Sequence, residues 1–247
     1  AIHAAIAAGE LTRDELFVTT KLWPGNAEWG QVPRDYDTTI AAFNDSLDRL
    51  GLDAVDLYLI HAPFPKAERL AQWRALVDLK EMGRTRTIGV SNYNEAHIEE
   101  IRAAGLPLPD ANQIELHPWS QKPALVKYLQ DNDIAIIAYS SQVPMATWRA
   151  VEGQDSAKTD AQRAEGQQDT PFKQMAAKYG VSEAQVLLRW GLQMGYAMLP
   201  KSVSEDRIRQ NFDLLSFEID AEDMAAMAAM DRDAALAWGS GDPLYVD

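Results

Sequence analysis

The sequence has 247 residues, of which 47% are apolar, so the chain is long enough to bury one large hydrophobic core. Its formal net charge of −14 argues against nucleic acid or an anionic membrane as a partner, because both require a broad basic face. The chain contains no cysteine, which excludes disulfides, thiolate metal sites and a cysteine nucleophile. No stretch reaches the roughly 18 apolar residues of a membrane span. We therefore expect a soluble, cytoplasmic protein without a metal site.

Short β-rich runs alternate with longer amphipathic stretches, a pattern typical of βα units around a parallel sheet. Strands are predicted at residues 16–20, 55–60, 87–90, 112–115, 134–138 and 196–199. Helices are predicted at residues 38–50, 67–82, 95–104, 123–130, 172–179 and 182–193. Several helices are followed by a glycine, at which we expect a left-handed cap. These glycines are Gly51, Gly83, Gly105 and Gly180.

Residues 142–169 are polar and lack periodicity, which predicts a long mobile loop of the kind that often covers a functional site. The sequence has no repeat of solenoid period and no linker rich in proline, glycine or serine. We therefore expect a single domain that spans residues 1–247.

Polar residues follow the predicted strands, and parallel α/β folds place their sites at the carboxyl ends of strands. Any one of these residues alone could be a solvated loop residue, but together they predict a small-molecule site on one face. At this stage a closed barrel and an open sheet both remain possible. The residues are Lys21, His61, Ser91, Asn92, Gln113, Glu115, Tyr139, Ser140, Lys201 and Ser202.

The segment 199–211 runs from a strand through a turn into a helix that Ser204 could cap. The free amides of a helix start favour an anion, and Lys201, Ser202 and Arg207 supply further donors beside it. This cluster suits a phosphate monoester. Taken alone, the segment could equally be a solvated helix start with basic residues on its outer face.

Six motifs occur in this order along the chain: VTTKLW at 18–23, DLYLIH at 56–61, TIGVSNY at 87–93, NQIELHP at 112–118, VLLRW at 186–190 and LPKS at 199–202. Together they resemble the motifs of the aldo-keto reductase family, in particular its bacterial 2,5-diketo-D-gluconate reductases. The resemblance covers essentially the whole chain and is weakest at residues 142–169. It implies a (β/α)8 TIM barrel that binds NADPH/NADP+ without a glycine-rich Rossmann turn.

The resemblance also implies a role for most of the predicted site residues. Ser91, Asn92 and Gln113 would hold the nicotinamide carboxamide, and Tyr139 would stack on the nicotinamide ring. Ser140 would begin the segment over the pyrophosphate. The 2′-phosphate and adenine would be met by the group Lys201, Ser202, Val203, Arg207, Gln210 and Asn211. Because this group includes the anion cluster described above, the resemblance favours NADPH over NADH.

Two residues are expected at the substrate. In addition, the sequence departs from the family pattern in two places. Trp23 and Trp238 would shape the substrate pocket, although Trp238 could equally be packing of the chain's tail. The family's Ser-Pro-Leu-Gly after the stacking tyrosine is Ser-Ser-Gln-Val at residues 140–143, which places closure over the pyrophosphate in doubt. A bulky residue usually follows this histidine in the family, whereas Ala62 follows His61 here, so the pocket shape is expected to differ.

Of the family's catalytic residues, Lys21 matches the lysine that lowers the pKa of a tyrosine acid, and His61 matches the histidine that orients the carbonyl. By the same resemblance, the tyrosine and the aspartate that pairs with the lysine would fall upstream of residue 1. Since a barrel of this type has eight strands and six are predicted here, we expect an N-terminally truncated barrel.

The expected function is NADPH-dependent reduction of the carbonyl of small aldehydes, ketones, keto acids or keto sugars to alcohols. The alternative is a catalytically silent NADPH-binding or regulatory barrel protein, and no positive feature supports a purely structural fragment. The expected partner is a small-molecule carbonyl substrate, not nucleic acid or a membrane, and we expect a monomer.

Overall fold

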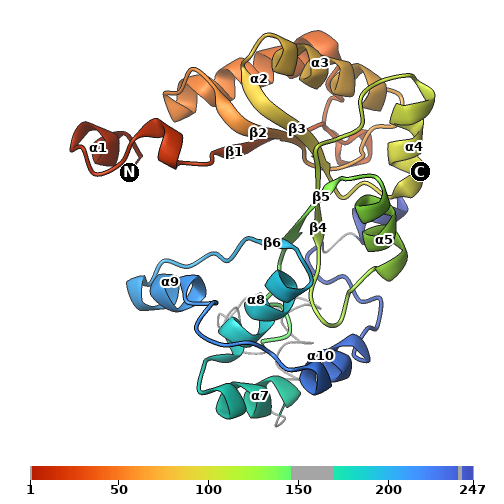
Figure 1. Cartoon of the computed structure of the whole chain (residues 1–247). Coiled ribbons are helices and arrows are strands. Elements are labelled where there is room, and N and C mark those ends of the chain that lie inside the picture. Colours follow the sequence, from red (N-terminus) through yellow and green to blue (C-terminus); the bar gives the residue numbers. More distant parts are fainter. Residues whose placement is uncertain (1, 146–169, 239–240, 247) are drawn as a thin grey trace. The chain divides into compact units, whose positions relative to one another are not determined.

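The computed structural model describes residues 2–145, 170–238 and 241–246 (Figure 1). The described residues divide into two compact units, one formed by residues up to 110 and the other by residues 111–246. Each unit contains three parallel strands with helices packed against them. The predicted loop at 142–169 lies outside the described residues from residue 146 onward.

The first unit is built around β2 (Val55–Ile60), which pairs in parallel with β1 (Thr19–Leu22) and with β3 (Thr85–Ser91). All six residues of β2 are buried, as expected for a strand covered on both faces. The helices and 3-10 turns of this unit are α1 (Ile2–Ala7), η1 (Arg13–Glu15), η2 (Ala27–Trp29), α2 (Tyr36–Leu50), α3 (Arg69–Glu81) and α4 (Glu95–Ala103).

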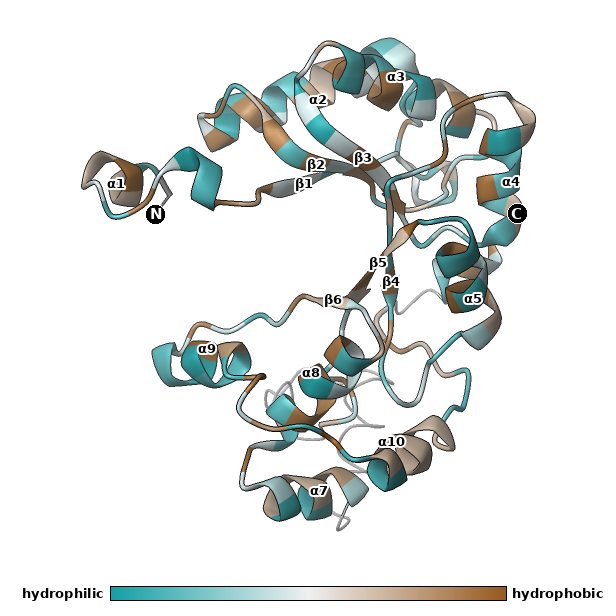
Figure 2. Ribbon diagram, in the orientation of Figure 1, coloured by the Kyte–Doolittle hydropathy of each residue, from teal (hydrophilic) through white to brown (hydrophobic). Residues whose placement is uncertain are grey.

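α2 covers the strands of the first unit with one stripe of its surface. Thr39, Phe43 and Leu47 are four residues apart and all three are buried, which is the spacing of a single helix face. The Phe43 ring packs edge-on against Tyr58 of β2, with ring centroids 4.7 Å apart. Figure 2 shows the corresponding mixture of hydrophobic and hydrophilic residues along α2 and α3.

One charged residue, Asp56, lies within the buried strand β2. Its carboxylate accepts the Val18 backbone N–H at 2.7 Å and pairs with Arg13 at 2.8 Å and Arg86 at 3.2 Å. Burial raises the pKa of Asp56, but the Val18 N–H and the two guanidinium groups outweigh this and lower the pKa below its usual value. The carboxylate therefore stays charged and ties the start of β2 to the segment that leads into β1.

In the second unit, β5 (Ala135–Tyr139) pairs in parallel with β4 (Ala111–Glu115) and β6 (Ala197–Met198). α5 packs on β5, α8 packs on β6, and α7 and α9 pack on α8. The helices and 3-10 turn are α5 (Pro123–Asp131), α7 (Pro171–Tyr179), α8 (Glu183–Gln193), α9 (Glu205–Phe212), α10 (Ala221–Ala228) and η3 (Pro243–Tyr245).

All six predicted strands and all six predicted helices are present; the strand at 55–60 has the predicted bounds, and the other elements are shifted at one or both ends. The largest shift is at the first strand, which was placed at 16–20 and lies at Thr19–Leu22. Lys21, Ser91 and Tyr139, which were expected just after strands, are strand residues. The four cap glycines have φ between 63° and 71°, as predicted. α10 was not predicted, and the single-domain organisation stays a prediction.

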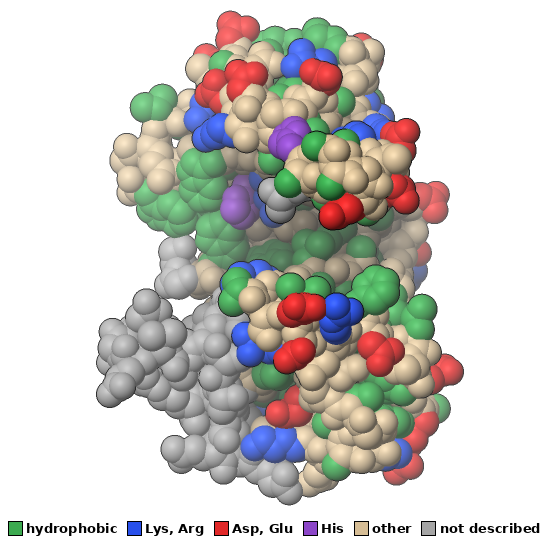
Figure 3. Space-filling view, turned by 90° about the vertical axis from the view of Figure 1, so that its left-hand side faces the viewer, with side chains coloured by type: hydrophobic (Ala, Val, Ile, Leu, Met, Phe, Trp, Pro, Cys, Tyr) green, Lys and Arg blue, Asp and Glu red, His purple; other side chains and the backbone are tan. Residues whose placement is uncertain are grey.

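Acidic side chains are spread over the surface of both units, in keeping with the net charge (Figure 3). None of the helices within the described ranges combines the length and apolar character needed to cross a bilayer.

Candidate active site

Lys21 and His61 lie beside one another in the first unit. Lys21 is on β1, His61 directly follows β2, and the His61 backbone N–H donates to the Leu22 carbonyl at 3.0 Å. Burial lowers the pKa of His61 to about 4, and the neighbouring Lys21 charge adds to this. Burial also lowers the pKa of Lys21. The imidazole is therefore neutral at pH 7 and can act as a hydrogen-bond donor and acceptor there.

An aromatic cluster contacts His61 through Trp23. The Trp23 ring meets the imidazole edge-on at 5.4 Å between centroids and stacks against Trp29 at 6.0 Å. Phe64 contacts both tryptophans, and the Trp23 indole N–H donates to Gln31 Oε1 at 2.6 Å. Trp23 was predicted to lie at the substrate, whereas Trp29 and Phe64 were not, because only the fold brings these loop residues together.

Ser91 is the last residue of β3, Asn92 directly follows it, and both are almost fully buried. Asn92 has a φ of 62°, a left-handed conformation that asparagine tolerates better than most residues. Its Nδ2 donates to the His61 carbonyl at 3.0 Å and contacts Ser91 Oγ at 3.1 Å. The structure thus brings together the predicted residues Lys21, Trp23, His61, Ser91 and Asn92 at the carboxyl ends of β1 to β3.

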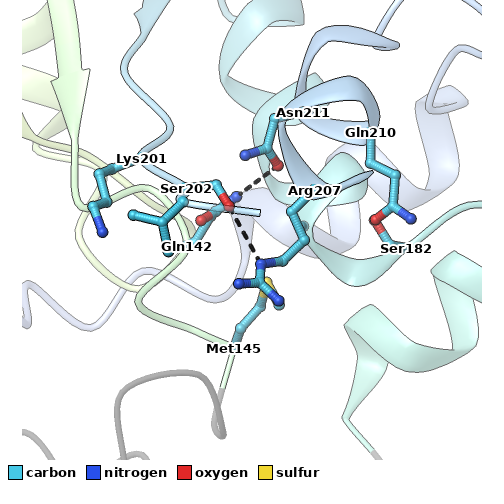
Figure 4. Close-up of a pocket in the computed structure, with 10 residues that line it drawn as sticks. Gln142, Met145, Ser182, Lys201, Ser202, Arg207, Gln210 and Asn211 are labelled. Atoms are coloured by element: carbon cyan, nitrogen blue, oxygen red, sulfur yellow. Dashed lines mark hydrogen bonds between the residues drawn. The ribbon is translucent and has the colours of Figure 1, made fainter. Parts of the chain in front are cut away.

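The second unit contains a cavity of about 410 Å³ between the β6–α9 segment and the chain that follows β5 (Figure 4). All six residues expected at the 2′-phosphate and adenine line it: Lys201, Ser202, Val203, Arg207, Gln210 and Asn211. Gln142, Met145, Ser182 and Ala184 complete the lining and were not predicted. A smaller cavity of about 40 Å³ lies beside Ser140, Ser141 and Lys201.

Two cations, Lys201 and Arg207, line this cavity. Arg207 Nε donates to Ser202 Oγ at 3.3 Å, and within the described residues neither Arg207 nor Lys201 forms an ion pair. Arg209, on the same helix, instead pairs with Glu205 at 2.7 Å. Uncompensated cations beside a hydroxyl fit the oxygens of a phosphate monoester.

The start of α9 differs from expectation in one detail. Ser204 occupies the N-cap position, but its side chain makes no capping hydrogen bond. Its backbone N–H donates to Ser202 Oγ at 3.1 Å instead. Ser202 therefore holds the turn and Arg207 together.

A hydrogen bond that the sequence did not predict spans the cavity. Gln142 Nε2 donates to Asn211 Oδ1 at 3.2 Å, and so joins the segment after β5 to α9 (Figure 4). Gln142 belongs to the Ser-Ser-Gln-Val sequence that departs from the family pattern. Ser140, in that same sequence, has a φ of 55°.

The remaining predicted residues of the second unit lie on or near its strands. Gln113 is a buried residue of β4, and Tyr139 ends β5. The indole N–H of Trp238 donates to the Tyr139 hydroxyl at 2.9 Å. Trp238 therefore lies against the residue expected to stack on the nicotinamide. Burial, followed by the nearby Glu115 carboxylate, raises the pKa of the Tyr139 hydroxyl far above the neutral range, so Tyr139 stays protonated.

Parallel α/β folds with polar residues at the carboxyl ends of their strands are typical of enzymes that bind small molecules there. The model of the aldo/keto reductase family matches residues 1–232, and the chain belongs to this family. It is 38% identical over 232 residues to the glyoxal reductase of Bacillus subtilis, with coverage of 94% of this chain and 74% of the relative. The methylglyoxal reductase DkgA of Yersinia pestis is 36% identical over 232 residues, with coverage of 93% and 74%.

Solved structures of the family match the chain as well. The aldo-keto reductase AKR2E4 of Bombyx mori, in complex with NADP, has a TM-score of 0.78 and 35% identity over 95% of this chain and 74% of its own. A D53A mutant of Gox0644 in complex with NADPH has a TM-score of 0.76 and 34% identity over 98% and 80%. The predicted fold class, the TIM barrel of the aldo-keto reductases, is thereby confirmed.

Proposed function

We propose that this protein is an NADPH-dependent carbonyl reductase of small aldehydes, ketones, keto acids or keto sugars. The observation that carries the proposal is the cavity beside α9, which Lys201 and Arg207 line and where Arg207 donates to the Ser202 hydroxyl; neither cation has an acidic partner among the described residues. A 2′-phosphate is the group that distinguishes NADPH from NADH, and these donors suit a dianionic phosphate. The relatives solved with NADP or NADPH add support.

The residues of the first unit suit the reduction of a carbonyl. When bound, NADPH supplies the hydride that adds to the carbonyl carbon. His61, neutral at pH 7, can donate an imidazole N–H to the carbonyl oxygen and hold it in place. Lys21 places a positive charge beside the imidazole, where negative charge develops on that oxygen.

The aromatic residues near His61 indicate the class of substrate. Trp23 contacts the imidazole and packs with Trp29 and Phe64 into an apolar aromatic cluster, which suits a small and weakly charged carbonyl compound. Among the relatives are reductases named for glyoxal and methylglyoxal, so these dicarbonyls are the first substrates to test.

The alternative is a protein that binds NADPH without turning it over. It follows from the expectation that the family's tyrosine acid and aspartate have no match among the 247 residues. A positioned acid typically contributes about 10²–10⁴ in rate. Under this alternative, binding would be intact while reduction of a carbonyl would be slower by at least that range.

A titration separates these possibilities. We expect NADPH to saturate the protein with an affinity at least about tenfold above that for NADH. Binding is measured by the quenching of tryptophan fluorescence. NADPH consumption is then measured with methylglyoxal and with glyoxal. Saturable binding with turnover supports the reductase, binding without turnover supports the silent alternative, and equal affinity for NADPH and NADH contradicts the role of the cavity.

The single domain and the monomeric state also remain proposals. Sedimentation equilibrium should give a mass near the 27.4 kDa of one chain. One cooperative urea transition, seen alike by circular dichroism and by fluorescence, would support a single domain.

A further inference from the structure

A buried carboxylate of the second unit holds a segment far along the chain. Glu115, the last residue of β4, is 2% exposed. Its Oε1 accepts the Leu236 backbone N–H and its Oε2 accepts the Ala237 backbone N–H, each at 2.8 Å. The two N–H groups belong to consecutive residues, so the two hydrogen bonds hold this backbone in a fixed orientation.

His117 completes the environment of this carboxylate. Its Nε2 lies 2.9 Å from Glu115 Oε1, and because a carboxylate only accepts, Nε2 carries the proton. Burial raises the pKa of Glu115, but the hydrogen bonds from His117, Leu236 and Ala237 outweigh it and lower the pKa. Glu115 is therefore charged at neutral pH and accepts three hydrogen bonds.

Trp238, the residue after Ala237, contacts Tyr139. The Trp238 indole N–H donates to the Tyr139 hydroxyl at 2.9 Å. Glu115 and Tyr139 are register partners on the adjacent strands β4 and β5, so their side chains project from the same face of the sheet. The segment 236–238 thus joins two neighbouring side chains: its backbone N–H groups bind Glu115, and its indole binds Tyr139.

We propose that Glu115 is a positioning residue for the cofactor's nicotinamide end: it fixes the segment 236–238, and through the Trp238 indole it fixes the Tyr139 ring. This inference rests on the proposed function, in which Tyr139 stacks on the nicotinamide. It assigns to Glu115 a contribution to binding, although Glu115 itself touches only protein. The adenosine end, bound in the cavity beside α9, is independent of it.

The two ends of the cofactor make this testable. In Glu115→Gln, the amide group replaces one acceptor oxygen with a donor, so one of the two backbone N–H groups loses its acceptor. We expect the dissociation constant of NADPH to rise by about threefold to tenfold, while that of 2′,5′-ADP, which lacks the nicotinamide, stays unchanged. Retained binding of 2′,5′-ADP also shows that the variant is folded.

A double-mutant cycle tests the route of the effect. Tyr139→Phe keeps the stacking ring and removes only the hydroxyl that Trp238 holds, and Trp238→Phe removes the donor while keeping an aromatic ring, although a smaller one. If Glu115 acts through this bond, Glu115→Gln should weaken NADPH binding no further in a Tyr139→Phe background. Trp238→Phe should reproduce the loss even where Glu115→Gln fails to fold.

The outcomes separate this inference from the proposed function. If the wild-type protein binds neither NADPH nor 2′,5′-ADP, the proposed function fails. If it binds both, and Glu115→Gln weakens both equally or the variants act additively, Glu115 has only a structural role and the inference is wrong.

Discussion

Arg207 and Arg209 are two positions apart on α9 and have different surroundings. Arg207 lines the cavity, contacts the Ser202 hydroxyl and has no acidic partner among the described residues. Arg209 pairs with Glu205, and both of these side chains are about three-quarters exposed. The helix therefore provides a cation for a ligand and, beside it, a matched cation that is already paired.

Replacing Arg207 by Ala should weaken NADPH binding by about 1–3 kcal/mol, because a charged hydrogen-bond partner of the phosphate is lost. NADH binding should be nearly unchanged. Calorimetric or fluorescence titration of both cofactors measures the difference. Arg209→Ala is the control and should alter neither affinity by more than about 0.5 kcal/mol. An equal loss for NADPH and NADH in the Arg207 variant would show that the phosphate does not lie at this residue.

The burial of His61 makes a second prediction at this scale. Its folded-state pKa is about 4, below the ordinary 6.5, because burial and then the Lys21 charge disfavour the imidazolium. Above pH 6.5 neither the folded nor the unfolded state binds this proton. As the pH falls from 6.5 to about 4, the unfolded state takes up a proton that the folded state does not, so stability is lost in this window.

His61→Gln should therefore lose less stability than the wild-type protein between pH 7 and pH 5, measured by urea unfolding at the two pH values. An NMR titration checks the cause directly, since the His61 imidazole should titrate near pH 4. A His61 midpoint near 6.5 would show that the imidazole is solvated.

The sequence indicated which residues lie together where they fall in one segment or at neighbouring strand ends, and it missed hydrogen bonds between distant segments. Lys201, Ser202 and Arg207 fall within one turn and helix start, so their convergence was predictable from the segment alone. Gln142 meets Asn211 across 69 positions, and Glu115 holds Ala237 across 122. No local pattern encodes such pairs, because register and tail packing of the folded chain create them.

At the scale of the element, α2 shows how a single face holds a helix in place. Phe43 and Leu47 are buried on one stripe, while Asp45 between them is exposed. The helix begins at an Asp35 cap that accepts the Thr38 N–H at 2.9 Å and ends at Gly51 with a φ of 63°. The caps fix where α2 starts and ends, and the burial of its apolar face determines how stably it packs on the strands.

Phe43→Ala should destabilise the protein by about 3–5 kcal/mol, because it removes a fully buried ring that packs on Tyr58 and leaves a cavity. Asp45→Ala on the same helix should change the free energy of unfolding by less than about 0.5 kcal/mol. Urea unfolding of both variants measures the contrast. Similar stabilities for the two variants would mean that α2 does not pack on the strands as described.

The boundaries that the sequence placed wrongly have physical explanations. In the first strand, the residues 16–18 are β-rich, but Leu16 closes η1 and the Val18 N–H is taken by the Asp56 side chain. The ladder with β2 therefore starts only at Thr19. α10 was missed because its sequence of alanines, methionines and acids carries a weak hydrophobic pattern, with Met227 its one buried residue.

For the whole molecule, the alternation of strands and helices was sufficient to predict a parallel α/β fold. Glycine caps marked the helix ends correctly because a left-handed residue is required there. The motifs that carry the family resemblance lie mostly at strand ends, where a barrel enzyme places its site. What the sequence could not give is the packing of the segment after α10, which is held by single side chains such as Glu115 and Lys122.

Lys201 and Arg207, which line the cavity beside α9, belong to a molecule whose net charge is −14. At about 0.01 M salt the Debye length is roughly 30 Å, so an approaching dinucleotide phosphate senses the repulsion of the whole chain. At about 0.15 M it shrinks to roughly 8 Å, and the phosphate senses mainly Lys201 and Arg207. Stopped-flow association of NADPH should therefore become faster as salt rises over this range. A rate that falls steadily would mean that the local cations govern the encounter at every distance.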